Sequence, residues 1–186
     1  GVKFRIVSHR NPVWTYSNVL RSIDRMWGWL GMYTSVVANS NAVGKSLSDY
    51  SDRYKRMVCI INNGVEKYYI PDDIRSIRKK LGLPLDELII VSVGRLSEQK
   101  RYDLALRVLA ELKEGILVIA GHGELQQVLE IMARELGIYD RVHFLGALAP
   151  VEVISLLKAS DIYLQTSGFE GQSNSLLEAI SSGCVV

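Results

Sequence analysis

The chain alternates short apolar runs with longer amphipathic segments from residue 88 to its end. Four largely apolar runs have the length of strands that are covered on both faces of a sheet. They lie at residues 88–93, 116–120, 142–145 and 161–165. After each run, apolar residues recur at helical spacing, at residues 102–112, 125–136, 150–159 and 173–182. Strands that alternate with helices predict a parallel, doubly wound α/β sheet with helices on both faces.

The upstream part shows the same alternation with shorter elements. We expect strands at residues 3–7, 35–38 and 58–61, and helices at residues 15–30 and 42–50. The pair Asn63–Gly64 predicts a turn after the third strand. Residues 65–86 hold many charges, two prolines and one short predicted helix, which is typical of a connection between domains. We therefore expect one domain at residues 1–70 and a second at residues 71–186.

The charges and cysteines of the sequence argue against several classes of site. The formal net charge is +2 and the Lys and Arg residues are scattered, so we expect no nucleic-acid surface. The longest stretch without charges, residues 26–44, contains Ser, Thr and Asn and is not expected to span a membrane. Cys59 and Cys184 lie in apolar runs and are expected to be buried free thiols of a reducing compartment. No cluster of His, Cys and Asp in the sequence indicates a metal site.

Both ends of the sequence lead us to expect an internal piece of a longer protein. The chain begins without Met in an apolar run, and it ends three residues after Gly183 in another apolar stretch. Buried strands begin in this way, so we expect that residues are missing on both sides.

Ligands of doubly wound sheets bind beyond the carboxyl ends of the strands. Arg95 and Lys100 follow the first strand of the second domain and precede a helix, whose first N–H groups also attract anions. This arrangement suits a diphosphate, and a solvated basic loop is the alternative. The Gly121-x-Gly123 pair resembles part of a dinucleotide fingerprint, but Gln126 replaces the third glycine. We therefore prefer a tight turn for this pair.

Two glutamates flank the start of the last helix. Glu170 lies in a glycine-flanked loop, and Glu178 lies inside the helix. Two carboxylates can accept hydrogen bonds from the vicinal hydroxyls of a sugar or a ribose. Ser175 with Glu178 also matches a capping box, which would give Glu178 a structural role instead. A helix that is capped by Ser173 or Asn174 would place Glu178 deeper in the helix.

These motifs resemble those of the retaining glycosyltransferases of family 4, also called group 1, which have the GT-B fold. The resemblance rests on Gly94-Arg95…Lys100 and on Glu170-x7-Glu178-Ala-x3-Gly183, and it extends from about residue 36 to the end. Asn63-Gly64-Val65 is similar to the family's Pro-Asn-Gly-Val turn at the domain junction, although Asn62 replaces the proline. Arg101 stands where the family often has glycine after the lysine.

The resemblance implies two Rossmann-like domains. Residues 1–70 would be the end of the N-terminal, acceptor-side domain, and residues 71–186 most of the C-terminal, nucleotide-sugar-binding domain. It also implies roles for single residues. Arg95 and Lys100 would bind the donor's diphosphate and stabilise the leaving group. Backbone N–H groups around Ser175 and Leu176 would face phosphate.

The other implied roles concern the sugar and the ribose. Glu170 would bind hydroxyls of the donor sugar near the reacting centre, and Glu178 would hold the ribose of the nucleotide. His9, at the end of a predicted strand, resembles the family's active-site histidine near the donor sugar; an ordinary loop histidine is the alternative.

The implied function is sugar transfer from a UDP- or GDP-sugar to an unknown sugar or lipid-linked acceptor, in polysaccharide or glycoconjugate biosynthesis. The family resemblance implies neither a metal nor another cofactor. Both domains must close over the donor, so we expect the 186-residue chain alone to be inactive.

Other functions stay open at this point. A glycoside hydrolase also uses two carboxylates, but it needs no cations at Arg95 and Lys100. A sugar-nucleotide epimerase shares the GT-B architecture, and a non-catalytic nucleotide-sugar-binding module would keep the same binding residues. Nucleotide-sugar chemistry and free thiols favour the cytoplasm. Trp27 and Trp29 are expected in the core, with a peripheral contact to the inner membrane face as the alternative.

Overall fold

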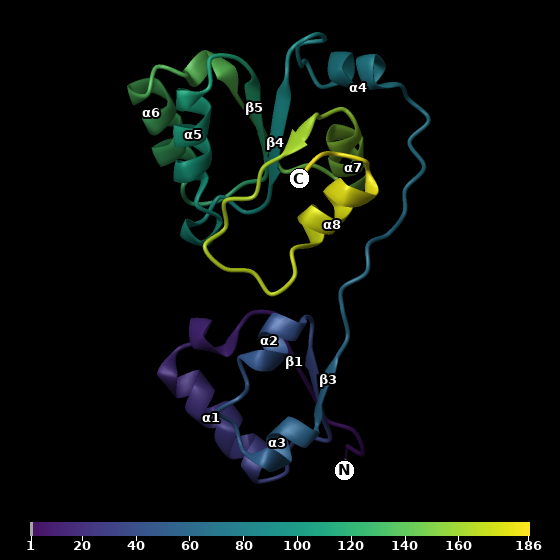
Figure 1. Cartoon of the computed structure of the whole chain (residues 1–186), viewed down its shortest axis with the longest axis vertical. Helices are drawn as coiled ribbons and strands as arrows, with labels where there is room; N and C mark the ends of the chain where they lie inside the picture. The colour runs from purple at the N-terminus through teal and green to yellow at the C-terminus, as the bar shows by residue number, and fades with distance from the viewer. Residues whose placement is uncertain (1) are drawn as a thin grey trace. The chain divides into compact units, whose positions relative to one another are not determined.

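The computed structural model describes residues 2–186, which form two compact units (Figure 1). Among these residues, unit 1 comprises 2–64 and Phe169–Ser173, and unit 2 comprises Val65–Gly168 and Asn174–Val186. The first change of unit falls between Gly64 and Val65. The assignment of residues 1–70 and 71–186 to the two domains of a GT-B fold stays a prediction.

Unit 1 contains a parallel sheet of three strands in the order β1-β2-β3. Its elements are β1 (Ile6–His9), a 3-10 turn (Val13–Thr15), α1 (Asn18–Trp29), β2 (Ser35–Ala38), α2 (Asn41–Lys45), α3 (Asp52–Arg56) and β3 (Val58–Ile60). Each α-helix begins after a serine whose hydroxyl accepts a hydrogen bond from the N–H three residues later; these are Ser17, Ser40 and Ser51. Such caps stabilise helix starts by about 1 kcal/mol, which matters for helices of five residues.

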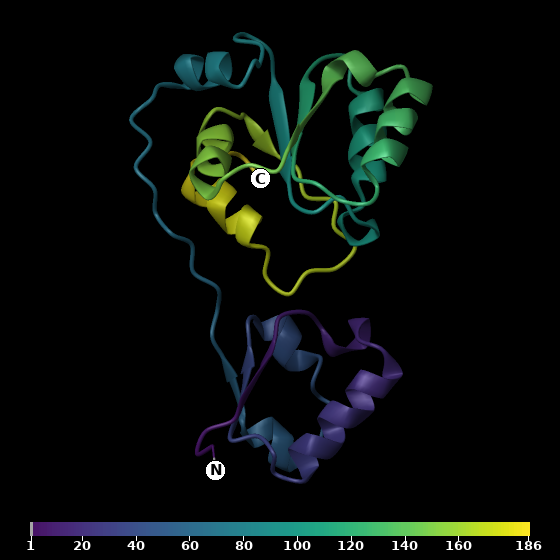
Figure 2. The same ribbon diagram turned by 180° about the vertical axis from the view of Figure 1, so that it is seen from behind.

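Unit 2 contains a parallel sheet of four strands in the order β6-β5-β4-β7. Its elements are α4 (Ile74–Lys80), β4 (Ile89–Val93), a 3-10 turn (Glu98–Lys100), α5 (Tyr102–Glu111), β5 (Ile116–Ala120), α6 (Gln126–Glu135), a 3-10 turn (Tyr139–Arg141), β6 (Val142–Gly146), α7 (Pro150–Lys158), β7 (Ile162–Tyr163) and α8 (Asn174–Ser181). Helices α5 and α6 cover one face of the sheet, and α7 and α8 cover the other (Figure 2). The predicted doubly wound α/β fold of this part is confirmed.

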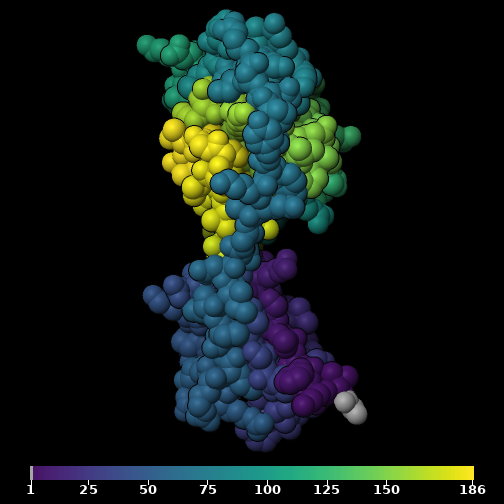
Figure 3. All heavy atoms as spheres, turned by 90° about the vertical axis from the view of Figure 1, so that its right-hand side faces the viewer, coloured from purple at the N-terminus to yellow at the C-terminus, as the bar shows by residue number. Residues whose placement is uncertain are grey.

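The segment before α4 lies along the surface of unit 2. Tyr68 and Ile70 pack against the core cluster that contains residues of α7 and α8. The Lys158 ammonium donates hydrogen bonds to the carbonyls of Ile70 (2.8 Å) and Asp72 (2.9 Å). Figure 3 shows this segment beside α8, which is drawn in yellow. Among residues 2–186, no helix combines the length and the apolar character that a bilayer crossing needs.

Three local predictions in unit 1 were wrong. The helix expected at residues 42–50 ends at Lys45, and the separate helix α3 was not foreseen. The helix contains Gly44, which weakens helices, while Ser51 supplies a new cap. The Asn63–Gly64 turn is absent, because Asn63 instead hydrogen-bonds twice to Gln172, from its N–H (2.6 Å) and from its side chain (3.1 Å). Residues 61–71 have no helix or strand.

The buried face of α1 also differs from the expected one. Trp27 and Trp29 were expected in the core, yet they are 46% and 65% exposed. α1 turns Asp24 and Gly28 inward instead, where Tyr54 packs against Gly28 and donates to the Asp24 carboxylate. Helical periodicity shows that a helix is amphipathic, but not that its apolar face is the one that is buried.

The two cysteines have different environments. Both are free thiols; Cys184 is buried as expected, whereas Cys59 is exposed. Cys59 lies on β3, an edge strand of the unit 1 sheet. Burial raises the pKa of the Cys184 thiol to about 11, so this thiol is unreactive at neutral pH.

Candidate functional site

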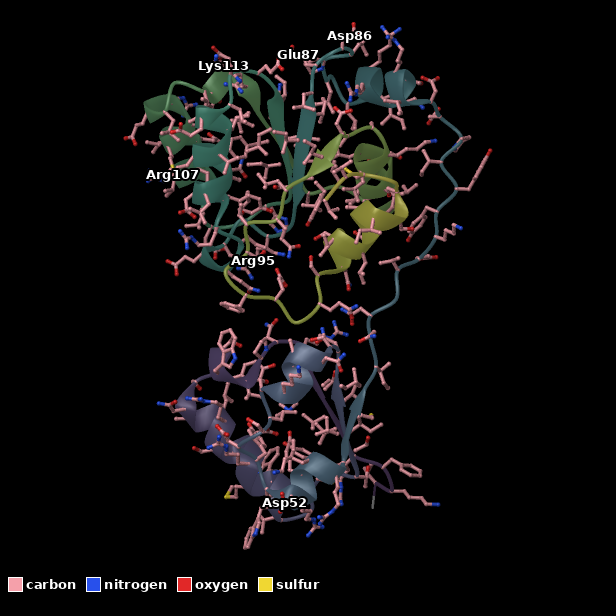
Figure 4. All side chains as sticks on the ribbon, in the orientation of Figure 1. Asp52, Asp86, Glu87, Arg95, Arg107 and Lys113 are labelled. Carbon is pink, nitrogen blue, oxygen red and sulfur yellow. The ribbon has the colours of Figure 1, made fainter. Side chains whose placement is uncertain are left out.

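Arg95 and Lys100 lie beyond the carboxyl end of β4, as the sequence predicted. Arg95 follows Gly94 directly after the strand, and Lys100 ends the 3-10 turn before α5. Figure 4 shows Arg95 at one end of the strands, and Asp86, Glu87 and Lys113 at the other end. The two cations therefore lie beyond the carboxyl ends of the strands, where doubly wound sheets bind their ligands.

An open hollow of about 600 Å³ lies at this edge. Its lining residues are Arg95, Gly121, His122, Gly123, Glu124 and Gln126. The Arg95 guanidinium donates to the Glu124 carboxylate at 3.2 Å, but the two side chains are 74% and 54% exposed. An ion pair this exposed contributes about 0–1 kcal/mol, so an incoming phosphate can replace Glu124 at little cost.

The glycine pair on the wall of this hollow does not form the expected tight turn by itself; the turn begins at Gly123, whose carbonyl accepts a hydrogen bond from the Gln126 N–H at 3.3 Å. Gly121 has φ +144°, and a Cβ there would overlap the carbonyl oxygen of Gly94. The turns after β4 and β5 are consequently in backbone contact, and the Gly94 N–H donates to the Ala120 carbonyl at 2.9 Å. A residue with a Cβ could not occupy position 121 without moving these two turns apart.

The segment after β7 is hydrogen-bonded to the turn that carries Lys100. The Thr166 hydroxyl donates to the Lys100 carbonyl, and the Gly168 N–H donates to the Gln99 carbonyl, both at 2.8 Å. Further along, the Tyr163 hydroxyl donates to the Ser175 hydroxyl at 2.8 Å. The first two bonds tie the segment after β7 to the Lys100 turn, and the third ties β7 to the start of α8.

Ser175 lies inside α8 and not at its N-cap, because the helix begins at Asn174. The capping-box alternative for Ser175 and Glu178 is therefore wrong, and Glu178 lies deeper in the helix, in its second turn. Leu176 packs partly buried against the core beside α8 and exposes no polar side-chain atom. Any polar contact of Leu176 with phosphate would come from its backbone N–H group, whereas Ser175 also has its hydroxyl, which accepts from Tyr163 and can itself donate.

Glu178 is a partly buried carboxylate without a hydrogen-bond or ion-pair partner in the described residues 2–186. Burial raises its pKa above the usual range of glutamate. A carboxylate that has lost part of its hydration and has no internal partner gains most from an external donor. A pair of ribose hydroxyls supplies such donors.

Glu170 belongs to the segment Phe169–Ser173, which is part of unit 1. A Cβ on the adjacent Gly171 would overlap the Arg10 carbonyl oxygen and lie 2.7 Å from Oδ1 of Asn39. The Phe169 and Trp14 rings make an edge contact at 5.9 Å. The structure thus brings the Glu170 segment next to the end of β1, where His9 lies.

His9 is the last residue of β1 and is buried, so it does not lie in a loop; its role near the donor sugar stays a prediction. Its Nε2 lies 2.8 Å from the Tyr54 hydroxyl and 3.5 Å from the Asp24 carboxylate. The single Tyr54 proton points to Asp24, at 3.0–3.1 Å. His9 must therefore donate from Nε2 to the Tyr54 oxygen, which leaves Nδ1 as an acceptor.

Burial also sets the charge of this group. Burial lowers the pKa of His9, and the Asp24 carboxylate partly opposes this shift. Burial and Asp24 together raise the pKa of Tyr54, so Tyr54 keeps its proton. At neutral pH His9 is a neutral imidazole in one fixed tautomer.

A model of the family described as "Glycosyl transferases group 1" matches residues 73–186, more than half of the chain. The chain belongs to this family. It is 33% identical over 169 residues to alpha-monoglucosyldiacylglycerol synthase of Streptococcus pneumoniae, which covers 86% of the chain and 38% of the relative. It is 29% identical over 153 residues to the lipopolysaccharide core biosynthesis glycosyltransferase LpsE of Rhizobium meliloti, which covers 81% of the chain and 42% of the relative.

Solved glycosyltransferase structures have the same fold. The structure of HepE from Anabaena in complex with UDP and glucose matches with a TM-score of 0.84 at 22% identity, over 96% of this chain and 51% of HepE. The expected GT-B type of α/β fold is confirmed. The chain spans about half, or less, of the length of these glycosyltransferases.

Arg101 occupies the position after Lys100 where the family often has glycine, and it adopts a backbone conformation that glycine favours. Its φ is +51°, the one positive φ of a non-glycine among the described residues. This conformation costs a non-glycine residue about 1 kcal/mol. The Arg101 guanidinium binds the Asp103 carboxylate with two hydrogen bonds of 2.9 Å, which favours the strained turn.

Three residues near the predicted site were missed. Asp24 and Tyr54 fix His9, and Asn39 has a buried Oδ1 that has no hydrogen-bond partner in residues 2–186. Asn39 directly follows β2, at the carboxyl edge of the unit 1 sheet, and this position is the one signal the sequence contains. Asp24 and Tyr54 are 30 residues apart and show no such signal.

The Asp24 carboxylate offers a test of the His9 assignment. We expect Asp24→Asn to lower the pKa of His9 further, because the negative charge that favours the imidazolium is removed. The amide oxygen of the introduced asparagine still accepts the Tyr54 proton. An NMR titration of the intact glycosyltransferase measures this pKa, with His122 and His143 as internal controls. A His9 pKa that stays unchanged or rises contradicts the assignment.

Proposed function

We propose that this chain is part of a retaining glycosyltransferase, in which unit 2 binds a nucleoside diphosphate sugar. The observation that carries the proposal is the partly buried, unpartnered Glu178 carboxylate, in the same unit as Arg95 and Lys100. A donor with a ribose and a diphosphate matches both features. Neither a solvated basic loop nor a helix cap explains them together.

The proposed chemistry uses the two cations. When the bond between the anomeric carbon and the phosphate oxygen breaks, negative charge develops on the diphosphate. Arg95 and Lys100 would stabilise that charge, together with N–H groups at the start of α8. Arg95 would exchange Glu124 for phosphate when the donor binds.

The resemblance to the family assigns Glu170 and His9 to the donor sugar. Glu170 would accept hydrogen bonds from sugar hydroxyls. The neutral His9 would accept a hydroxyl proton at Nδ1, since Nε2 already donates to Tyr54. We propose this acceptor role for His9 in place of a cationic one, because burial disfavours its protonated form.

The donor and acceptor classes follow from the relatives. The HepE structures contain UDP, UDP with glucose, and UDP-glucose. The names of two relatives refer to a glycolipid and to lipopolysaccharide. We therefore propose a UDP- or GDP-sugar as donor and a sugar or lipid-linked acceptor, with the reaction in the cytoplasm, where nucleotide sugars are found. We expect the 186-residue chain alone to transfer no sugar.

A binding screen of UDP-, GDP- and ADP-sugars against the intact protein tests this function. Tight binding of one donor, followed by transfer with retention at the anomeric carbon, supports it. Hydrolysis of glycosides without a nucleotide would favour a glycoside hydrolase. Isomerised nucleotide sugar would favour an epimerase, and binding without turnover would favour a binding module.

Glu178→Gln should weaken nucleotide binding about tenfold or more, because a charged acceptor of the ribose hydroxyls is lost. The same variant should gain stability without ligand at pH 8. The raised pKa of Glu178 means that the wild-type fold loses stability as the pH rises through this pKa, whereas the introduced glutamine has no charge to desolvate. Calorimetry with UDP and urea unfolding measure the two effects.

Glu135→Gln is the matched control for this experiment, since Glu135 is an exposed carboxylate on α6. It should change neither property. If the Glu178→Gln protein is less stable and keeps its nucleotide affinity, Glu178 has a structural role and does not bind the ribose.

A further inference from the structure

The outer face of α1 carries a row of exposed apolar side chains, here named the α1 face. Its members are Val19, Ile23, Met26, Trp27, Trp29 and Leu30. Most of them recur at helical spacing, so they form one stripe along the helix. Exposed stripes of this kind on a folded unit indicate an interaction site.

The α1 face is distinct from the side of the helix that packs. Asp24 and Gly28 face Tyr54, and the Arg25 guanidinium lies 4.9 Å over the ring of Tyr50. Figures 1 and 2 show α1 at the outside of unit 1, with only one side facing the rest of the unit. The polar side of α1 is therefore the packing side. On its apolar side the Trp27 ring makes one edge contact with the Tyr33 ring, at 6.5 Å between centroids, and all six side chains of the α1 face are exposed.

Positive charge lies at the C-terminal end of the α1 face. Residues 2–64 contain nine Lys and Arg residues and three Asp residues, a surplus of six positive charges in a chain whose total is +2. Arg5 donates to the Gly31 carbonyl at 3.2 Å, and Arg53 to the Trp29 carbonyl at 3.5 Å. These guanidinium groups thus lie at the end of the helix that carries Trp29. The one acid on α1, Asp24, points inward.

We propose that the α1 face docks on an anionic lipid surface. Tryptophan, Met and Leu side chains enter the boundary between headgroups and acyl chains, and the arginines bind lipid phosphates. A second copy of the chain fits less well, because a symmetric contact would bring two arginine-rich rims together. Docking on lipid is independent of the proposed sugar transfer and would place unit 1 at a membrane.

Sedimentation of the intact protein with lipid vesicles tests the proposal. We expect binding to vesicles that contain phosphatidylglycerol, little binding to pure phosphatidylcholine vesicles, and weaker binding as salt rises. Met26→Gln combined with Leu30→Gln should reduce the partition coefficient about tenfold or more. This variant keeps all three tryptophans, so their emission should shift to the blue with lipid in the wild type and much less in the variant.

Ile131→Gln is the matched control, because Ile131 is an exposed apolar residue on α6 of unit 2. It should leave vesicle binding unchanged. Circular dichroism checks that the double variant folds; if it does not fold, quenching of wild-type tryptophan emission by brominated lipids decides instead.

Four results would overturn the proposal. They are absence of binding to anionic vesicles, binding that the double variant retains, and a dimer in solution that the double variant dissociates. The fourth is tryptophan emission that is already blue-shifted and shielded from acrylamide without lipid, which would show that another part of the intact protein covers the α1 face.

Discussion

Lys100→Ala in the intact glycosyltransferase should lower kcat about 100- to 1,000-fold and change nucleotide affinity much less. The reason is that a cation aimed at the leaving diphosphate stabilises charge that develops mainly in the transition state. The position of Lys100, in a turn that is tied to residues 166 and 168 by hydrogen bonds, holds the charge in place before the reaction. Steady-state kinetics with the donor found by the binding screen measures the effect.

Lys113 provides a control for this variant, because it is an exposed lysine at the opposite edge of the same sheet (Figure 4). Lys113→Ala removes the same charge from unit 2 and should leave kcat within about twofold, since charges beyond a Debye length are screened. If both variants slow the reaction equally, Lys100 acts through the net charge of the unit. If Lys100→Ala raises only KM, the lysine binds the donor equally in its ground and transition states.

The strands and helices of unit 2 could be predicted because the apolar runs and the glycine and proline positions all indicate the same structure. The buried strands β4 and β5 are continuous apolar runs, which parallel strands covered on both faces require. Gly137 has φ +69° just after α6, and Pro150 begins α7, as glycine and proline at these positions predict. These signals are local, so a single sequence displays them.

The inner face of α1 and the partners of His9 could not be predicted in the same way. Periodicity favoured burial of Trp27, and the packing is decided by Asp24 and Tyr54, which lie 30 residues apart. The tautomer of His9 depends on a proton that Tyr54 gives to Asp24, and no spacing in the sequence expresses that competition. This part of the candidate site is formed by residues that are far apart in the sequence and come into contact only in the folded protein.

The candidate residues themselves were found from motifs, and the structure adds the neighbours of each. Arg95 and Lys100 follow β4 as expected, while Glu124 as the partner of Arg95 was not foreseen. For Glu178, the sequence left a capping box and a ligand role open. The start of α8 at Asn174 removes the first, because the box requires its serine at the N-cap.

Gly171→Ala should lower kcat about 100-fold or more, although Gly171 has no side chain that could react. An added Cβ would overlap the Arg10 carbonyl oxygen and lie 2.7 Å from Oδ1 of Asn39, and both are groups of unit 1 that cannot move aside without strain. The segment must shift instead, and Glu170 shifts with it. A displacement of about 1 Å of a catalytic group is enough for a loss of this size.

Gly168→Ala is the matched control for this loop, three residues earlier. A Cβ there would meet the Gln99 carbonyl oxygen at 3.8 Å, an ordinary contact distance, and Gly168 does not have a positive φ. This variant should keep kcat within about twofold and leave the stability nearly unchanged. Kinetics and urea unfolding of both variants show whether a lower kcat comes from a displaced Glu170 or from a less stable fold. Gly171→Ala should retain most of its donor affinity, because Arg95, Lys100 and Glu178 belong to unit 2. If Gly171→Ala proves as active as Gly168→Ala, the position of Glu170 beside Arg10 does not matter for transfer, and its proposed contact with the donor sugar is wrong.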